Sequence, residues 1–233
     1  MTRLADLAWP EVRTLAGQGA VLLVPMGSTE QHGPHLPVTT DTDIAGAIVS
    51  HPAIGLRLPH AVVAPPLPYG SSGEHDGFSG TLSIGRKATE LVVMELVRSA
   101  SASFSAVVVV STHGGNAAPV DQAVSRLRAE GRNVRGWSPR WQGDAHAGRT
   151  ETSLMLAVAP DRVDLAVAEP GDTRPLAEIL PALRAGGVSS VSPNGVLGDP
   201  TAATKAEGDR LLAAAVDDLI RFVDGSGGGE ALR

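Results

Sequence analysis

The stretch that decides the fold begins with the apolar run Val21-Leu22-Leu23-Val24-Pro25 and continues into the polar run Glu30-Gln31-His32-Gly33-Pro34-His35-Leu36-Pro37-Val38-Thr39-Thr40-Asp41. The apolar run is short and apolar on both faces, as expected for a central strand of a parallel sheet. The polar run follows it closely and holds side chains of types that bind metals, namely Glu30, His32, His35 and Asp41. Because ligands bind beyond the carboxyl ends of parallel strands, this order predicts a site at that edge.

The composition narrows the kind of site that the chain can build. None of the 233 residues is a cysteine, so a transition-metal site must use imidazole and carboxylate groups. These ligands suit zinc, iron or manganese held for hydrolysis rather than a closed structural zinc. The lack of cysteine is also compatible with the cytoplasm, where we expect the protein.

Charge and hydropathy argue against two classes of partner. The formal net charge of −6 disfavours nucleic acid and anionic membranes. The N-terminus lacks a long apolar stretch, so no signal peptide is expected. The most continuous apolar run, at residues 106–110, is far shorter than the roughly 20 residues of a membrane helix.

Strand-like and helix-like patterns alternate along the chain, which predicts an α/β fold with a mostly parallel sheet. We expect strands at residues 21–25, 61–64, 106–110 and 134–137, and helices at residues 43–50, 86–103, 116–130, 150–158 and 201–223. The glycine- and proline-rich stretch at 65–85 is too long for a turn and indicates a functional loop region. Residues 1–224 are expected to form a single domain, and residues 225–233 a flexible tail.

Further candidate site residues follow the other predicted strands. His113 comes directly after the strand at 106–110, in Ser111-Thr112-His113-Gly114-Gly115-Asn116. His146 and Glu151 follow the strand at 134–137 at a greater distance. Parallel packing would bring these loops to the edge where the 30–41 run lies. Glu74 lies in a glycine-rich loop, where a carboxylate can contact a substrate amine or amide.

Each of these residues also has a purely structural interpretation. Asp41 or Asp43 can cap the next helix, and Glu151 can complement a helix dipole. His113 can face solvent in a simple strand-to-helix turn, and Glu74 can be a solvated loop tip. No dinucleotide fingerprint, P-loop or serine-hydrolase elbow occurs in the sequence, so those three enzyme classes lack their usual sequence support.

Taken together, these motifs resemble the creatininase (creatinine amidohydrolase) family over roughly residues 20–155. The opening motif at 30–37 with Asp41-Thr42-Asp43 is followed, in the family's order, by the Glu74-His75 loop, the His113-Gly114-Gly115-Asn116 turn, and His146-Ala147-Gly148 with Glu151. The resemblance implies a three-layer α/β/α sandwich, a centre of two divalent metal ions and a homo-oligomer, frequently a hexamer.

Within the family, the chain most resembles peptidases that act on the mycofactocin precursor peptide. The resemblance is carried by Tyr69-Gly70-Ser71-Ser72-Gly73-Glu74-His75 and Phe78-Ser79-Gly80-Thr81-Leu82-Ser83-Ile84-Gly85. It implies removal of a C-terminal Val-Tyr dipeptide from the modified precursor, and iron, with or without zinc, as the metal. The alternatives are an amidohydrolase of the same family that acts on a cyclic amide or formamide, and a non-catalytic metal-binding scaffold.

One position departs from the family pattern. Creatininase has a glutamate two residues after the histidine of the third-strand loop, where this chain has Gly115. We expect Glu151 to supply the missing carboxylate.

The expected mechanism is two-metal amide hydrolysis, with the ions roughly 3.5–4 Å apart. Asp41 would bridge the ions, and Glu30, His32, His113 and Glu151 would complete their coordination. His146 would carry a proton to the leaving amine, since an unperturbed imidazole titrates near working pH. Glu74 would orient the substrate, and His35 would support the ligands without binding metal.

Overall fold

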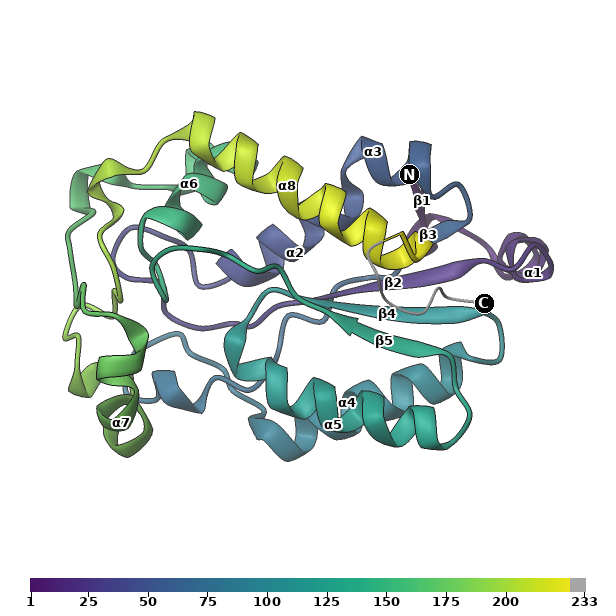
Figure 1. Ribbon diagram of the computed structural model, residues 1–233, viewed down its shortest axis with the longest axis horizontal. Coiled ribbons are helices and arrows are strands. Elements are labelled where there is room, and N and C mark those ends of the chain that lie inside the picture. Colours follow the sequence, from purple (N-terminus) through teal and green to yellow (C-terminus); the bar gives the residue numbers. More distant parts are fainter. Residues whose placement is uncertain (227–233) are drawn as a thin grey trace.

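A parallel sheet of five strands runs through the centre of the protein in a computed structural model (Figure 1). The strand order is β1-β3-β2-β4-β5, and every pairing is parallel. The strands are β1 (Thr2–Arg3), β2 (Val21–Met26), β3 (Ala61–Val63), β4 (Ala106–Ser111) and β5 (Val134–Trp137). The structure describes residues 1–226, so the predicted tail at 225–233 lies mostly outside the described residues.

Helices cover both faces of this sheet. They are α1 (Trp9–Gly17), α2 (Thr40–Ser50), α3 (Pro52–Arg57), α4 (Gly85–Ala100), α5 (Ala117–Ala129), α6 (Arg149–Val158), α7 (Leu176–Gly186) and α8 (Lys205–Asp224). Helices α4 and α5 lie on one face, and α2, α3 and α8 on the other (Figure 1). This confirms the predicted three-layer α/β/α sandwich. No helix within residues 1–226 has both the length and the apolar character needed to span a membrane.

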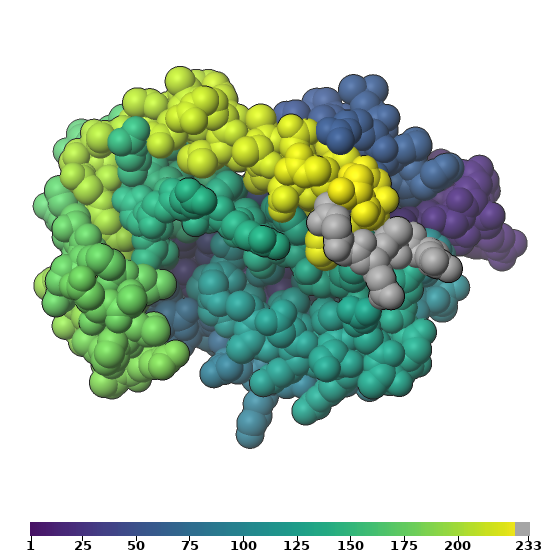
Figure 2. Space-filling model, viewed as in Figure 1, coloured from purple at the N-terminus to yellow at the C-terminus, as the bar shows by residue number. Residues whose placement is uncertain are grey.

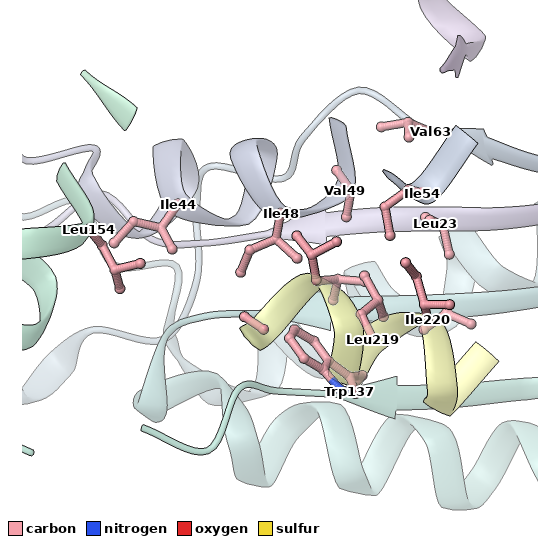
Figure 3. Close-up of a cluster of buried hydrophobic side chains, with 14 of the residues drawn as sticks. Leu23, Ile44, Ile48, Val49, Ile54, Val63, Trp137, Leu154, Leu219 and Ile220 are labelled. Carbon is pink, nitrogen blue, oxygen red and sulfur yellow. The ribbon is translucent and has the colours of Figure 1, made fainter. Parts of the chain in front are cut away.

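Alternate residues of the central strands build two separate cores. Leu22 and Val107 face the side of α4 and α5, whereas Leu23 and Val108 face the side of α2, α6 and α8. Figure 3 shows the second core, where Leu219 and Ile220 of α8 pack near Leu23 and the helix-α2 side chains. Because β2 and β4 are buried on both faces, their sequences are apolar without alternation.

The predicted strands are all present, but several helices differ from the prediction. The helix expected at 43–50 begins at Thr40, which places Asp41 in its first turn. The helix expected at 201–223 begins at Lys205, because Pro200–Ala202 forms a separate 3-10 turn and the Thr204 side chain caps α8.

Three helices were not predicted at all, namely α1, α3 and α7. Each contains a proline, which is usually taken as a sign of a loop. In α1 and α3 the proline occupies one of the first two helical positions, where its missing N–H has no intrahelical partner to lose. In α7, Pro181 lies inside the helix.

The close crossing of α6 and α8 has a glycine at its centre. A Cβ atom at Gly208 would lie 1.8 Å from the backbone oxygen of Ser153 and 3.0 Å from the side chain of Ala157. Helix α6 begins just before Glu151, so this crossing also positions a candidate site residue. Backbone atoms cannot move aside as a flexible side chain can, so only glycine fits at this position.

We expect Gly208→Ala to destabilise the fold although alanine is the better helix former. The forced separation of α6 and α8 should cost about 1–3 kcal/mol, lowering the melting temperature by several degrees in a thermal unfolding experiment. The matched control is Gly46→Ala in α2, where an added Cβ meets nothing within 4 Å. That change should instead stabilise by roughly 0.4–1 kcal/mol. Equal effects of the two substitutions would contradict this account of the crossing.

Candidate metal centre

The segment after β2 delivers three ionisable side chains into the interior. Glu30 and His32 are 0% exposed and Asp41 is 2% exposed. The segment turns at Gly33, which has a positive φ of 67°, and then enters α2, whose first turn contains Asp41. Burying carboxylates costs free energy unless they are paired, and no lysine or arginine of the described chain forms an ion pair with Glu30 or Asp41.

The other two loops meet this segment at the same edge of the sheet, as predicted. His113 directly follows β4 and is 6% exposed, and His146 is 8% exposed. Glu151 lies in the first turn of α6, where its Oε2 accepts a hydrogen bond of 2.6 Å from the backbone N–H of Ala147. Ala147 has a positive φ of 52°, which is unusual for a residue with a side chain and marks the tight turn between His146 and Glu151.

Nitrogen and oxygen atoms of these residues converge at short range. His113 Nδ1 lies 3.2 Å from Glu30 Oε1 and 3.4 Å from Asp41 Oδ2. His32 Nε2 lies 3.6 Å from Asp41 Oδ1 and 3.9 Å from Glu151 Oε2. Two ligand atoms bound to one zinc-like ion are roughly 3.2–3.5 Å apart. The spacing therefore suits shared coordination.

Backbone carbonyls fix which ring nitrogen of each histidine faces the cluster. His113 Nε2 donates to the carbonyl of Ser71 at 2.8 Å, and His32 Nδ1 donates to the carbonyl of Glu30 at 3.1 Å. The other nitrogen of each ring then points a lone pair at carboxylate oxygens, unless a proton or a metal ion lies between them. Such outer hydrogen bonds are a regular feature of metal-binding histidines.

Unpartnered polar atoms mark the same place. Among the buried side-chain atoms without a hydrogen-bond partner are both Glu30 oxygens and His32 Nε2. Buried polar atoms are nearly always satisfied in native proteins, so these three call for a ligand. A divalent cation would satisfy all of them together.

The two histidines that face carboxylates have raised pKa values. Burial lowers the pKa of His32, but Asp41, Glu151 and Glu30 outweigh it and raise the pKa to about 9. Burial likewise lowers the pKa of His113, whereas Glu30, Asp41 and Glu74 raise it to about 10. Without metal, each ring therefore holds a proton in the position that a cation would take.

The pKa values of the other buried groups in the cluster are shifted as well, upward for Glu151 and downward for Glu30 and His146. Burial raises the pKa of Glu151 to about 7, partly offset by His32. Burial would also raise the pKa of Glu30, but His113, His75 and His32 hold it well below its usual value. Burial and the neighbouring His32 and His75 hold the pKa of His146 well below its ordinary value.

Three groups of these residues are arranged closely enough to hold an ion. They are Glu30, Asp41 and His113; His32, Asp41 and Glu151; and Glu30, His32 and His146. In each group the ligand atoms lie within 4.8 Å of one another. The first two groups share Asp41 and use different oxygens of its carboxylate. This arrangement fits two ions with Asp41 between them.

Glu74 lies on the other side of the His113 ring. Its Oε1 is 3.6 Å from His113 Nε2, and the side chain is 37% exposed. A Cβ atom added at Gly115 would lie 2.5 Å from this oxygen, so Glu74 occupies the space that a side chain at position 115 would need. Glu151 belongs to a possible ligand group with His32 and Asp41, and its replacement of the carboxylate missing at position 115 stays a prediction.

Two residues of the opening motif lie outside the cluster. His35 is buried beside it, and its Nε2 contacts Thr152 Oγ1 at 2.9 Å. Asp43 points elsewhere and forms an ion pair of 2.6 Å with Arg162. Only Asp41, of the two aspartates, faces the centre.

Two residues were missed by the sequence analysis. His75 is 3% exposed, and its Nε2 lies 3.3 Å from Glu30 Oε1. Its Nδ1 accepts a hydrogen bond of 2.9 Å from the side-chain Nε2 of Gln31, and the backbone carbonyl of Gln31 accepts a hydrogen bond of 2.8 Å from His146 Nε2. His75 adjoins Glu74 in the sequence, which was a usable signal. Nothing in the sequence pattern indicated Gln31 as the support of both rings.

A cleft of about 1240 Å³ opens above this cluster. Glu30, Asp41, His113, His146 and Glu151 line it, together with residues of the β5–α6 connection and of α7. Figure 2 shows the hollow between the green segment that contains α7 and the teal segment, with purple atoms of the N-terminal part deep inside. The buried cluster is therefore open to a sizeable ligand.

Comparison with known proteins places this geometry in a family. The family model described as creatininase, creatinine amidohydrolase, matches residues 5–223. The chain is 51% identical over 210 residues to the mycofactocin precursor peptide peptidase of Mycolicibacterium smegmatis, covering 88% of this chain and 85% of that protein. It is 48% identical over 211 residues to the corresponding peptidase of Mycobacterium tuberculosis, covering 87% and 84%.

Solved creatininase structures share the fold of this chain, and one of them is described with zinc. A creatinine amidohydrolase structure has a TM-score of 0.81 at 25% identity and covers 98% of this chain and 99% of its own. Another creatininase structure, with a TM-score of 0.79 at 25% identity over 97% of this chain and 98% of its own, is described as the Zn-Zn type. Fold, cluster and sequence together establish that the chain belongs to the creatininase (creatinine amidohydrolase) family.

Proposed function

We propose that the protein is a metal-dependent peptidase of the cytoplasm. Its substrate would be the modified mycofactocin precursor peptide, from which it would remove the C-terminal Val-Tyr dipeptide during mycofactocin biosynthesis. The observation that carries the proposal is the buried cluster of unpartnered Glu30 and His32 atoms within a wide cleft. The peptidase relatives, about half identical over most of the chain, support the choice of substrate.

The cluster fits two divalent ions, for which Fe²⁺, Zn²⁺ or both are our proposal and Mn²⁺ is also compatible. Glu30, Asp41 and His113 would hold one ion, and His32, Asp41 and Glu151 the other. When bound, the ions would polarise the scissile carbonyl and lower the pKa of a water molecule.

Two further residues would handle the proton and the substrate. His146 Nε2 donates to the backbone carbonyl of Gln31, so its Nδ1 faces the cluster, 3.9 Å from Glu30 Oε1 and from Glu151 Oε2, and its lowered pKa keeps the ring neutral at pH 7. We assign it the transfer of a proton from the attacking water to the departing amine. Glu74 lies at the cleft wall with a pKa raised by burial, and we assign it the orientation of the peptide.

The size of the cleft favours a peptide over a small cyclic amide. Sites for small molecules usually measure about 300–1,000 Å³, and this cleft reaches about 1240 Å³. Creatinine would leave most of this space to water. An extended peptide would fill it.

We also propose that residues 1–224 act as one domain and that the protein is a homo-oligomer, with a hexamer as the family resemblance suggests. Large apolar side chains of the single chain are exposed in the loop before α4, namely Tyr69 at 48% and Leu82 at 54%, and on α4 itself, namely Leu91 at 56%. Burial against further copies would remove these surfaces from water.

The direct test of the proposed function is product analysis by mass spectrometry. The protein is incubated anaerobically with iron and the modified precursor peptide, and in parallel with creatinine. We expect a truncated peptide and a free Val-Tyr dipeptide, with creatinine unchanged. Hydrolysis of creatinine alone would reject the peptidase assignment, and binding of the peptide without any turnover would favour a non-catalytic scaffold.

In the same assay His146→Gln should lower kcat by roughly 10²–10⁴ while the bound metal stays unchanged. This separates proton transfer from metal binding, because His146 also belongs to one of the three possible ligand groups. Loss of metal together with activity would make His146 a ligand instead.

Metal stoichiometry tests the ligand assignment without reference to activity. We expect about two ions per chain in the wild type, close to one in Glu151→Gln, and the lowest content in Asp41→Asn, because both groups use Asp41. Elemental analysis after gel filtration measures this. The matched control is Asp43→Asn in the same helix as Asp41, because the Asp43 carboxylate pairs with Arg162 and its loss should leave the metal content intact. Full metal content in Asp41→Asn would refute the bridge.

Metal binding should also release protons. In the metal-free protein His32 and His113 stay protonated up to about pH 9 and pH 10, and ligands must lose their protons to bind. Glu151, whose pKa is raised to about 7, holds roughly half a proton at pH 7, so calorimetric titration at this pH in buffers of different ionisation enthalpy should show about two and a half protons released on filling both sites. The number should fall, and apparent affinity should rise, as the pH increases through 9 and 10. An observed binding enthalpy that is the same in every buffer would contradict these pKa shifts.

A further inference from the structure

Helix α7 forms one wall of the cleft and carries two apolar stripes. One stripe anchors it, since Ile179 is 1% exposed and packs with Val188 and Leu197. The other faces the cleft through Leu176 and Leu180, and Leu176 is 48% exposed. The anchoring stripe packs α7 against a neighbouring surface, whereas the second stripe leaves apolar area on the cleft wall open to a ligand.

The row formed by Leu176 and Leu180 ends in a cation. Arg184 lies a further four residues along α7, and all three residues line the cleft. Residues four apart are neighbours on a helix surface, so they form one continuous strip. This strip is apolar along most of its length and carries a guanidinium at its C-terminal end.

That end of the strip lies close to the turn that carries Glu74. Just beyond α7, Gly187 has a positive φ of 71°, and a Cβ there would lie 2.8 Å from the carbonyl oxygen of Glu74. The end of α7 is thus pressed against the turn that carries Glu74, whose carboxylate lies 3.6 Å from His113. Arg184 precedes this contact by less than one helical turn.

The charges in the cleft make Arg184 available to a ligand. Three arginines line the cleft, but Arg174 is engaged by both oxygens of Asp172. Arg184 and Arg140 form no ion pair with any acidic residue in the described part of the chain. Within the described residues, Arg184 therefore offers a guanidinium without an ion-pair partner to a substrate with a negative end.

We propose that Arg184 and the Leu176–Leu180 strip form a subsite for the C-terminal residue of the peptide. The guanidinium would bind the terminal carboxylate through paired hydrogen bonds, and the leucines would pack against an apolar or aromatic side chain. An extended dipeptide spans about 7 Å. Binding of the terminal carboxylate at this subsite would therefore fix the number of residues between the cleaved bond and the end of the peptide. This inference rests on the proposed peptidase function and adds how the end of the peptide is recognised.

The test compares the precursor peptide with its C-terminal amide, which keeps the length and removes the charge. Wild-type kcat/KM should be roughly 10- to 100-fold higher for the free acid. Arg184→Gln should raise KM for the acid by a similar factor, leave the amide nearly unaffected, and bring the acid-to-amide ratio close to one. Arg184→Lys should keep part of the preference, because it keeps the charge without the planar fork. Arg174→Gln is the matched control, since this arginine is already paired, and the ratio should persist.

The outcomes separate this subsite from the proposed function itself. If wild type cleaves acid and amide equally, the subsite is refuted while the peptidase function stands. If Arg140→Gln removes the preference and Arg184→Gln retains it, the assignment to Arg184 is refuted. If neither peptide is cleaved, the peptidase function fails and the subsite with it. The acid-to-amide ratio is unaffected by a general loss of folded protein, so misfolding does not imitate the expected result.

Discussion

The rest of the centre depends on one constraint, the burial of two carboxylates without a cationic side chain beside them. Glu30 and Asp41 lie almost wholly out of water, and their oxygens face imidazole nitrogens. Backbone carbonyls hold the outer nitrogen of each ring as a donor, which turns lone pairs toward the carboxylates. This arrangement is stable only with positive charge in the middle. Protons on His32 and His113 supply it without metal, and divalent ions would supply it more fully.

The fold provides the rigidity that this constraint requires. Strands β2 and β4 pair along their whole length, so the loops after Met26 and Ser111 start from fixed positions. The third contribution comes from the start of α6, which the crossing at Gly208 holds against α8. Asp41 is tied from both sides, since Ser28 donates to its carboxylate and Thr112 donates to its backbone carbonyl. These bonds link the β2 and β4 loops through one residue.

The sequence was sufficient for the strands and for most of the cluster, because both follow from local patterns. Apolar runs without alternation indicate buried parallel strands, and the loops after them must meet at one edge. It was insufficient where the outcome depends on packing between distant segments. Gln31 supports two histidines from loops far away in the chain, and Glu74 fills the space left by Gly115. Helix α7 was missed because Pro181 hides its pattern, although a neighbouring surface anchors it.

The floor of the cleft is the buried cluster, and its walls are α7 and the connection after β5. This division bears on which substrate the protein selects. The proposed chemistry of the floor, amide hydrolysis near divalent ions, does not by itself choose a substrate. Selection must come from groups that contact parts of the substrate away from the reacting bond. Here those groups lie on α7 and on the connection after β5, which differ in chemistry from the floor by being apolar and cationic. Glu74 connects the floor and the walls, because its carboxylate lies 3.6 Å from His113 while its turn packs against α7. Substrate choice within this fold is therefore expected to follow changes in the wall segments, while the residues of the floor stay fixed by the charge balance of the buried cluster.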